Sequence, residues 1–328
     1  MFGNTWLKTP DKPYSESVRE LREALNSCDA VVIGAGSGLS AAAGYRYSGE
    51  LFERYFWDFQ SKYGIRDMYS GGFYPFPDIE TFWAWWGRHI WVNRYSPIPS
   101  DLYEKLFALV KGRDYFVLTT NVDHCFQRAG FDKKRLFYTQ GDYGLFQSVS
   151  PHGASKKKTY DNEEMVRKMV LSQGFEISGN GELIVSDRGR IRMSVDKDLI
   201  PVCPDDGCAM VPNLRSDDTF VEDAGWHEAT ASYGDFLALH GIEAYGFFTE
   251  DSTEKVSRSY RGKILFLELG VGANTPGIIK YPFWQYTAEN ENALYACLNM
   301  GDAAAPKEIS DRSILIDGDI AQAVADLQ

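Results

Sequence analysis

Apolar and polar positions alternate along the chain with the two periods that distinguish helices from strands. Between residues 15 and 27, Val18, Leu21 and Leu25 recur at helical spacing among polar residues, and a strand-like apolar run follows at residues 30–33. Similar runs predict four more strands, at residues 115–120, 136–138, 263–269 and 313–316. Apolar strands separated by long connections are typical of a parallel sheet covered by helices.

Polar or glycine-rich residues follow every one of these strands. Because open α/β sheets bind their ligands at the carboxyl ends of the strands, the pattern predicts a doubly wound sheet with a ligand at that edge. The first strand leads into Gly34-Ala35-Gly36-Ser37-Gly38 and then into a small-residue helix start. Such a loop lets backbone N–H groups approach a pyrophosphate, although the third glycine of the usual dinucleotide motif would fall on Leu39.

Two stretches differ in amino-acid composition from the sheet domain, one aromatic and one polar, and indicate insertions. We expect the sheet domain to comprise residues 1–145 and 233–328, with a helical, aromatic-rich insertion at about 45–95 and a small module at 146–232. In the module, residues 175–177 and 182–185 flank Gly179-Asn180-Gly181, which predicts a hairpin. The aromatic cluster favours a helix that packs one side into a core; it comprises Phe82, Trp83, Trp85, Trp86 and Trp91.

Composition narrows the possible partners. The net charge of -12 opposes nucleic-acid binding, which depends on Lys and Arg. We find neither an apolar window long enough for a membrane span nor a signal peptide. Five cysteines, an odd and scattered set, suit a reducing compartment, so we expect a cytoplasmic location and no membrane partner.

Five segments form one pattern along the chain: Gly34–Ser40, Asp67–Pro75, Gln140–Gly144, Glu268–Pro276 and Lys280–Trp284. Together they resemble the sirtuin family, and in detail its macrodomain-linked class M. Gly36-Ser37-Gly38-Leu39-Ser40 is similar to the family's phosphate loop, and Thr120-Asn121-Val122-Asp123 is similar to its Q-N-I-D motif. Gln140-Gly141 falls where the family has its catalytic H-G, and further matches lie at Gly270-Val271-Gly272, Leu298-Asn299 and Gly318-Asp319-Ile320.

The resemblance implies a sirtuin-like, Rossmann-type sheet that binds NAD and splits the bond between nicotinamide and ribose. It assigns the reaction pocket to Asn121, Asp123 and Gln140. From local sequence alone, an Asx turn at a strand end explains Asn121 and Asp123 equally well. The residues expected to bind NAD are Ala35, Gly36, Ser37, Gly38, Ser40, Gly270, Gly272, Asn274, Asn299 and Ile320.

Gln140 separates the candidate reactions. An amide side chain does not titrate, so it cannot serve as the general base that deacylation requires. A carboxylate acceptor needs no base, because it is anionic at neutral pH. The substitution favours mono-ADP-ribosyl transfer to an acidic side chain of a protein. Relatives of class M imply a lipoylated carrier of the glycine-cleavage-H type as acceptor, and a functional pairing with a macrodomain that removes ADP-ribose. An NAD-dependent deacylase or delipoylase, and a non-catalytic NAD or ADP-ribose sensor, remain alternatives.

Three further expectations concern departures from the family pattern. The Phe-Arg pair that guards the ribose is absent, and Tyr47, Arg46 or Arg54 are candidates to replace it. Cys203 and Cys208 lack the earlier cysteine pair, and His152 alone cannot complete four ligands, so we expect no ordered zinc. We exclude His124 and His240 as bases, because a lone histidine is more often structural. In addition, the helix that begins at His124 should turn this side chain away from the strand ends.

Overall fold

The computed structural model describes residues 7–249, 251–272 and 276–328. Within these ranges six parallel strands form the main sheet, in the order β13-β11-β10-β2-β3-β4. When the six strands of this sheet are numbered by their order along the chain, their spatial order is that of the Rossmann fold. The predicted doubly wound α/β class is therefore confirmed. The strands are β2 (Ala30–Ala35), β3 (Asp114–Thr119), β4 (Leu136–Tyr138), β10 (Ile264–Leu269), β11 (Ala293–Asn299) and β13 (Ser313–Asp317).

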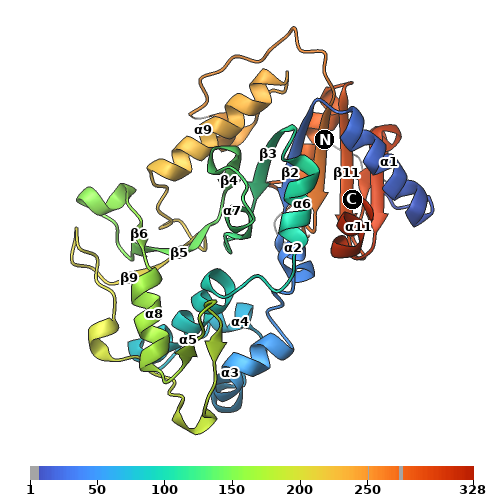
Figure 1. Ribbon diagram of the computed structural model, residues 1–328. Coiled ribbons are helices and arrows are strands. Elements are labelled where there is room, and N and C mark those ends of the chain that lie inside the picture. Colours follow the sequence, from blue (N-terminus) through green and yellow to red (C-terminus); the bar gives the residue numbers. More distant parts are fainter. Residues whose placement is uncertain (1–6, 250, 273–275) are drawn as a thin grey trace.

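Helices cover both faces of this sheet (Figure 1). In β2, Val31 and Ile33 face one core, whereas Ala30 and Val32 face the other. Burying aliphatic side chains of this size stabilises the fold by about 1.5–3 kcal/mol each. The first core is covered by α1 (Tyr14–Ser27), α2 (Ser37–Ala42), α6 (Leu102–Val110) and α11 (Ile320–Asp326), and the second by α9 (Ala224–Leu239) and α10 (Lys280–Glu289).

The two predicted insertions form a single smaller lobe with one shared core. Trp83 and Trp85 from the first insertion are fully buried in the same cluster as Val166 and Met169 from the second, so the aromatic cluster is a core element as predicted. The lobe contains α3 (Glu50–Tyr63), α4 (Met68–Gly72), α5 (Ile79–Ile90), the π-helical turn η1 (Trp91–Tyr95) and α8 (Glu163–Ser172). Its antiparallel sheet comprises β5 (Gly141–Ser148), β6 (Tyr160–Asp161) and β9 (Met210–Leu214).

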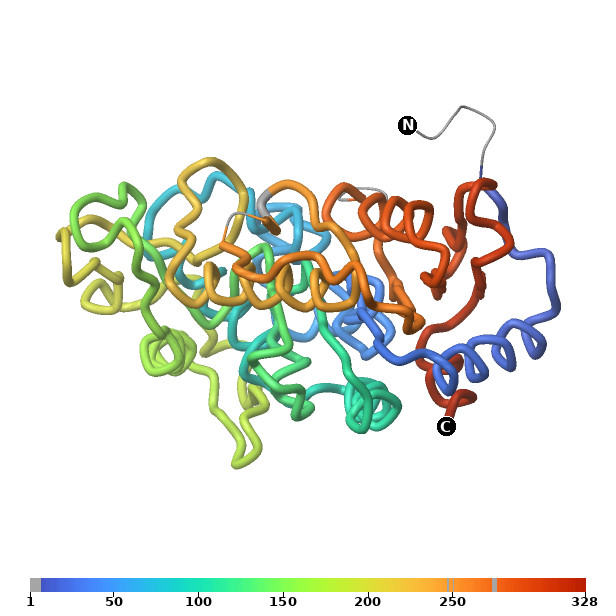
Figure 2. The backbone as a smooth tube through the Cα atoms, turned by 90° about the horizontal axis from the view of Figure 1, so that it is seen from above, coloured from blue at the N-terminus to red at the C-terminus, as the bar shows by residue number. Residues whose placement is uncertain are grey.

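Figure 2 shows the smaller lobe at one end of the molecule and α1 and α11 at the other. The predicted hairpin is present as β7 (Glu176–Ile177) and β8 (Leu183–Ile184), which pair antiparallel. None of the helices in the described ranges combines the length and apolar character of a membrane span. The remaining short elements are β1 (Leu7–Lys8), β12 (Ala305–Pro306), α7 (Cys125–Arg128), η2 (Lys133–Arg135), η3 (Gly153–Lys157), η4 (Arg188–Arg190), η5 (Lys197–Leu199), η6 (Gly246–Thr249) and η7 (Lys307–Arg312).

Candidate active site

The glycine loop after β2 packs directly on the loop after β10, where the order of strands along the chain reverses. The Gly36 N–H donates to the Leu269 carbonyl at 3.0 Å, and the Gly38 N–H donates to the Gly270 carbonyl at 2.9 Å. A Cβ at Gly38 would lie 2.8 Å from the Gly270 Cα, so only glycine fits this contact. Gly36 and Gly38 thus hold two strand ends together, at the point where doubly wound sheets bind their ligands.

The expected NAD-binding residues lie along this same edge of the sheet. Ser37 and Gly272 are exposed, whereas Ala35 is buried. The Asn299 side chain donates to the Val271 carbonyl at 3.0 Å and so joins the end of β11 to the β10 loop. The Ile320 side chain is only 4% exposed and packs in the core. Asn274 lies outside the described residues.

Asn121 and Asp123 stand after β3, next to the glycine loop. The Asn121 amide donates to the Gly36 carbonyl at 3.0 Å. The Asp123 carboxylate accepts from the Ser40 hydroxyl and from the Cys125 N–H. The Asn121 and Asp123 side chains are both buried, and their contacts reach across to α2 rather than closing only their own turn. Ser40 therefore belongs to the same cluster as Asp123.

Tyr103 of α6 completes this cluster and was missed from the sequence. Its hydroxyl lies 3.0 Å from the Ser40 Oγ, and its side chain is fully buried. Burial and the nearby charge of Asp123 raise the pKa of Tyr103 well above its ordinary value, so the hydroxyl stays protonated. Tyr103 sits in an apolar helical pattern, where a tyrosine is normally read as core, and no local signal singles it out.

Gln140 is half-buried in the turn between β4 and β5. Its carbonyl accepts from the Arg215 N–H at 3.0 Å, and its side-chain amide donates to the Thr139 hydroxyl at 3.3 Å. The next residue, Gly141, has φ of 95°, and a Cβ there would lie 2.0 Å from the Asn213 carbonyl oxygen. The smaller lobe thus fixes the position of Gln140 through a contact that only glycine allows.

A small cavity opens at the end of β3. Asn121 and Asp123 line it, and so do His124, Tyr138 and Asp142. The expectation that a helix turns His124 away from the strand ends is therefore wrong. The helix α7 is a single turn that begins after His124, and His124 itself has left-handed backbone geometry with φ of 66°.

His124 is part of a charged network beside the cavity. Its Nδ1 lies 2.6 Å from an Asp142 carboxylate oxygen, and the other oxygen accepts from the Arg94 Nε at 2.7 Å. Burial alone would raise the pKa of Asp142, but the hydrogen bond with His124 and the charge of Arg94 hold that pKa below its ordinary value. Asp142 is therefore a carboxylate at neutral pH.

Three candidates for the missing Phe-Arg pair occupy different surroundings. The Tyr47 hydroxyl bonds to that of Tyr143 at 2.9 Å. Burial and, to a smaller extent, the charge of Asp123 raise the pKa of Tyr47 to about 12. Arg46 is exposed, and Arg54 pairs with Glu182 at 2.9 Å on the surface of the hairpin. Among the three, Tyr47 is the one whose pKa is affected by a residue of the candidate site, Asp123.

His240 has the structural role expected of a lone histidine. Its Nδ1 lies 2.7 Å from the Phe236 carbonyl in the preceding helical turn. Its Nε2 lies 3.1 Å from a carboxylate oxygen of Asp114, which begins β3, whereas Asn121 follows the end of that strand. His240 therefore lies at the amino ends of the strands, away from the site.

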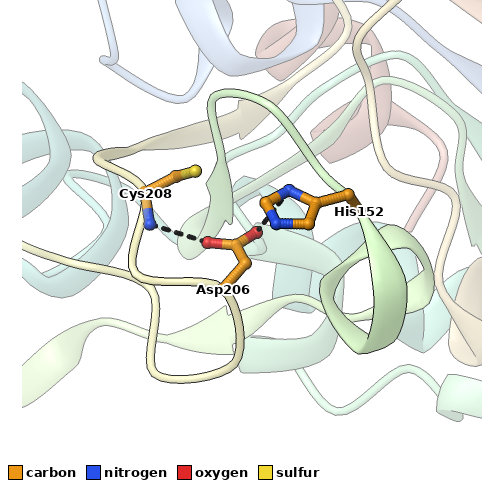
Figure 3. A group of neighbouring side chains, drawn as sticks. All are labelled: His152, Asp206 and Cys208. Atoms are coloured by element: carbon orange, nitrogen blue, oxygen red, sulfur yellow. Dashed lines mark hydrogen bonds and ion pairs between the residues drawn. The ribbon is translucent and has the colours of Figure 1, made fainter.

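A second polar group lies in the smaller lobe, where the family resemblance raises the question of zinc. His152, Asp206 and Cys208 place one ligand atom each within 4.8 Å of one another (Figure 3). The Asp206 oxygens already accept from the Ser155 hydroxyl and the Cys208 N–H. Cys203 is not one of the three; its thiol lies 3.3 Å from the Tyr160 hydroxyl and also interacts with the Asp206 carboxylate. In the described ranges the group thus offers three ligands and does not match a closed, four-ligand zinc site.

Solved structures with similar folds are sirtuins. A Sir2 mutant in complex with a p53 peptide and NAD has a TM-score of 0.51 and 17% identity, over 94% of this chain and 96% of that chain. A structure described as the structural basis of sirtuin substrate affinity has a TM-score of 0.50 and 17% identity, over 94% and 97%. At this identity the similarity shows the fold, which is that of sirtuins.

Sequence relatives define the family more narrowly. No family model matches the chain. A protein ADP-ribosyltransferase of Staphylococcus aureus strain Mu50 is 33% identical over 301 residues, which are 92% of this chain and 83% of that protein. A probable bifunctional ADP-ribose hydrolase/ADP-ribosyltransferase of Fusarium oxysporum f. sp. cubense is 30% identical over 312 residues, 92% of this chain and 46% of that protein. The chain belongs to the family of protein ADP-ribosyltransferases with the sirtuin fold, and the predicted enzyme class is confirmed.

Proposed function

We propose that the chain transfers a single ADP-ribose from NAD to an acidic side chain of a protein acceptor, with release of nicotinamide. The observation that carries the proposal is Gln140. It is held at the sheet edge beside Gly141, and its amide bonds only weakly to its neighbour Thr139. An amide at this position cannot act as the base for deacylation, whereas a carboxylate acceptor arrives without a proton to remove.

The pocket residues supply positioning rather than proton transfer in this reaction. With NAD bound, Asp123 would accept a hydrogen bond from the carboxamide, and Asn121 and Gln140 would hydrogen-bond the ribose. Ser37 and Gly272 are exposed at the edge where β2 and β10 meet, which suits the pyrophosphate. When NAD is bound, it supplies nicotinamide as leaving group, and groups fixed in advance stabilise the developing charge.

We propose that the acceptor is a lipoylated carrier protein of the glycine-cleavage-H type. This choice of acceptor rests on the class M resemblance. The fungal relative is named for both ADP-ribose hydrolysis and ADP-ribosyl transfer, and this chain spans less than half of it. That name supports a functional pairing with an activity that removes ADP-ribose, such as a macrodomain.

The test incubates the protein with labelled NAD and a lipoylated H-like carrier. Nicotinamide release and label on the carrier are followed for the wild type and for Asn121→Ala and Gln140→Ala. Asn26→Ala, at the exposed end of α1, is the matched control. We expect label on the carrier that both pocket variants lose and the control keeps. Intact NAD with every lipoylated target would contradict the proposal.

The same assay separates the alternatives. A deacylase or delipoylase would leave free O-acyl-ADP-ribose and no labelled protein. A sensor would bind NAD or ADP-ribose without releasing nicotinamide. Because all three activities fit one fold, the products have to decide between them.

A further inference from the structure

His124 has a backbone conformation that its residue type disfavours. Among the described residues other than glycine, it alone has a positive φ, at 66°. For a residue with a Cβ, this left-handed region is sterically disfavoured. Residues held in such geometry cluster at functional sites. The bond to Asp142 shows what holds His124 there, since the side chain reaches β5 from this position.

The partner of His124 determines which ring nitrogen carries the proton. Asp142 is ionised, so its oxygens accept hydrogen bonds and do not donate them. The His124 Nδ1 must therefore be the donor in the 2.6 Å contact. In a neutral imidazole this leaves Nε2 unprotonated, with its lone pair available. A carboxylate that orients a histidine in this way also stabilises the imidazolium formed when Nε2 takes a proton.

The location of His124 makes this lone pair useful. His124 is one of the residues that line the same cavity as Asn121 and Asp123, and its side chain is 25% exposed. Around it stand Asp142 on β5 and Tyr138 on β4, while Arg94 on η1 neutralises part of the Asp142 charge. The cavity lining thus includes a side chain that can accept a proton, which the amide of Gln140 cannot do.

We infer that His124, oriented by Asp142, is a general base that lets this site pass ADP-ribose to neutral O–H acceptors, either water or a hydroxyl side chain, in addition to carboxylates. The inference rests on the proposed function. In the step, the acceptor oxygen bonds to the ribose C1′ while the C1′–N bond breaks and its electron pair leaves with neutral nicotinamide. The acceptor proton goes to the His124 Nε2 and then to solvent. With a carboxylate acceptor there is no proton to move.

Two substitutions at His124 test this without endangering the fold. Asn tolerates left-handed geometry and can still bond to Asp142, but it cannot take a proton. Gly relieves the backbone strain and leaves space for added imidazole. The matched control is His227→Asn, because His227 makes the same kind of contact, 2.7 Å to Asp251, on the exposed part of α9.

The experiment follows nicotinamide release into water without a protein acceptor. It also follows label on the carrier, divided into ester label that neutral hydroxylamine removes and hydroxyl-linked label that resists it. We expect His124→Asn and His124→Gly to lower NAD hydrolysis and resistant label by about 10²-fold or more, the contribution of a general base. Ester label should fall by much less. Imidazole should restore the His124→Gly hydrolysis, and His227→Asn should match the wild type.

Two results would overturn the inference while leaving the proposed function intact. One is ester label on the carrier with no His124-dependent hydrolysis or resistant label. The other is an equal loss of both kinds of label in His124→Asn. Absence of nicotinamide release with every acceptor, in the wild type itself, would instead overturn the proposed function.

Discussion

Two arginine–aspartate pairs, six residues apart on one helical stretch, illustrate how this chain separates stability from chemistry. Arg88 of α5 makes two bonds to the Asp58 carboxylate, at 2.7 and 2.9 Å, and further bonds to Gln173 and to backbone carbonyls. Its guanidinium also lies over the rings of Phe59 and Phe175. Arg88 is fully buried and its donors are satisfied within the smaller lobe.

Arg94 of η1 is arranged differently. It binds one oxygen of Asp142 and leaves the other to His124, which lines the cavity. The turn that carries Arg94 is π-helical, a feature often found at functional sites. A saturated, enclosed ion pair holds a lobe together, whereas a pair that extends to an accessible imidazole can act on a substrate. The two arginine–aspartate pairs have the same residue types and differ in what else the aspartate contacts: Asp142 also binds His124 at the cavity.

The largest effect on stability should follow from Arg88→Met. Removing the cation leaves the Asp58 carboxylate without its partner, and breaking a buried ion pair costs about 3–5 kcal/mol. Urea unfolding measures the loss. Arg88→Met/Asp58→Leu, which removes both charges, should recover part of it. A loss below about 1 kcal/mol in the single variant would show that this pair is not the stabilising one.

Arg94→Met should cost less stability and more activity. Asp142 keeps its bonds to His124 and to the Gly144 N–H, so the expected loss is about 1–3 kcal/mol. Hydroxyl transfer should fall further than ester formation, because the loss of Arg94 raises the pKa of Asp142 and disturbs the orientation of His124. Denaturation and the two label classes are measured on one preparation. If Arg94→Met lowered the free energy of unfolding as much as Arg88→Met does, the proposed difference between the two pairs would be contradicted.

His89, which follows Arg88 in α5, should make stability depend on pH. Its Nε2 lies 2.8 Å from the Tyr143 hydroxyl, and burial lowers the pKa of His89 to about 3 from an ordinary 6.5. Between these values the unfolded chain binds a proton that the folded protein does not. The free energy of unfolding should therefore fall as pH decreases below about 6.5, by up to about 1.4 kcal/mol per pH unit.

Urea midpoints between pH 7.5 and 5 measure this slope, and His89→Phe is the comparison. The variant should show a shallower slope over the same range. An unchanged slope would mean that His89 is accessible to protons in the folded state.

The sequence predicts the parallel sheet well because apolar runs such as residues 264–269 are buried on both faces and read as strands. It predicts neither β11 nor β5 as a strand. In β11, Ala293, Ala296 and Cys297 are small, and tertiary contacts on both faces bury them. β5 begins with Gly141-Asp142, whose buried carboxylate looks like a loop residue until its partners His124 and Arg94 are known.

The candidate site was predictable where one motif carries it, as in residues 121–123, and not where distant segments meet. The Tyr103–Ser40 contact joins residues 63 positions apart, and the His124–Asp142 contact joins two motifs through their backbone geometry. A left-handed histidine has no signature in a single sequence. That is why a rule based on helix direction placed His124 wrongly.

The most direct test of the whole account is a crystal structure with a non-hydrolysable carbocyclic analogue of NAD. The account predicts the nicotinamide ring beside Asn121, Asp123 and His124, with the pyrophosphate at the Ser37 and Gly272 edge. An analogue bound with its nicotinamide away from these three residues would contradict the assignment of the reaction pocket.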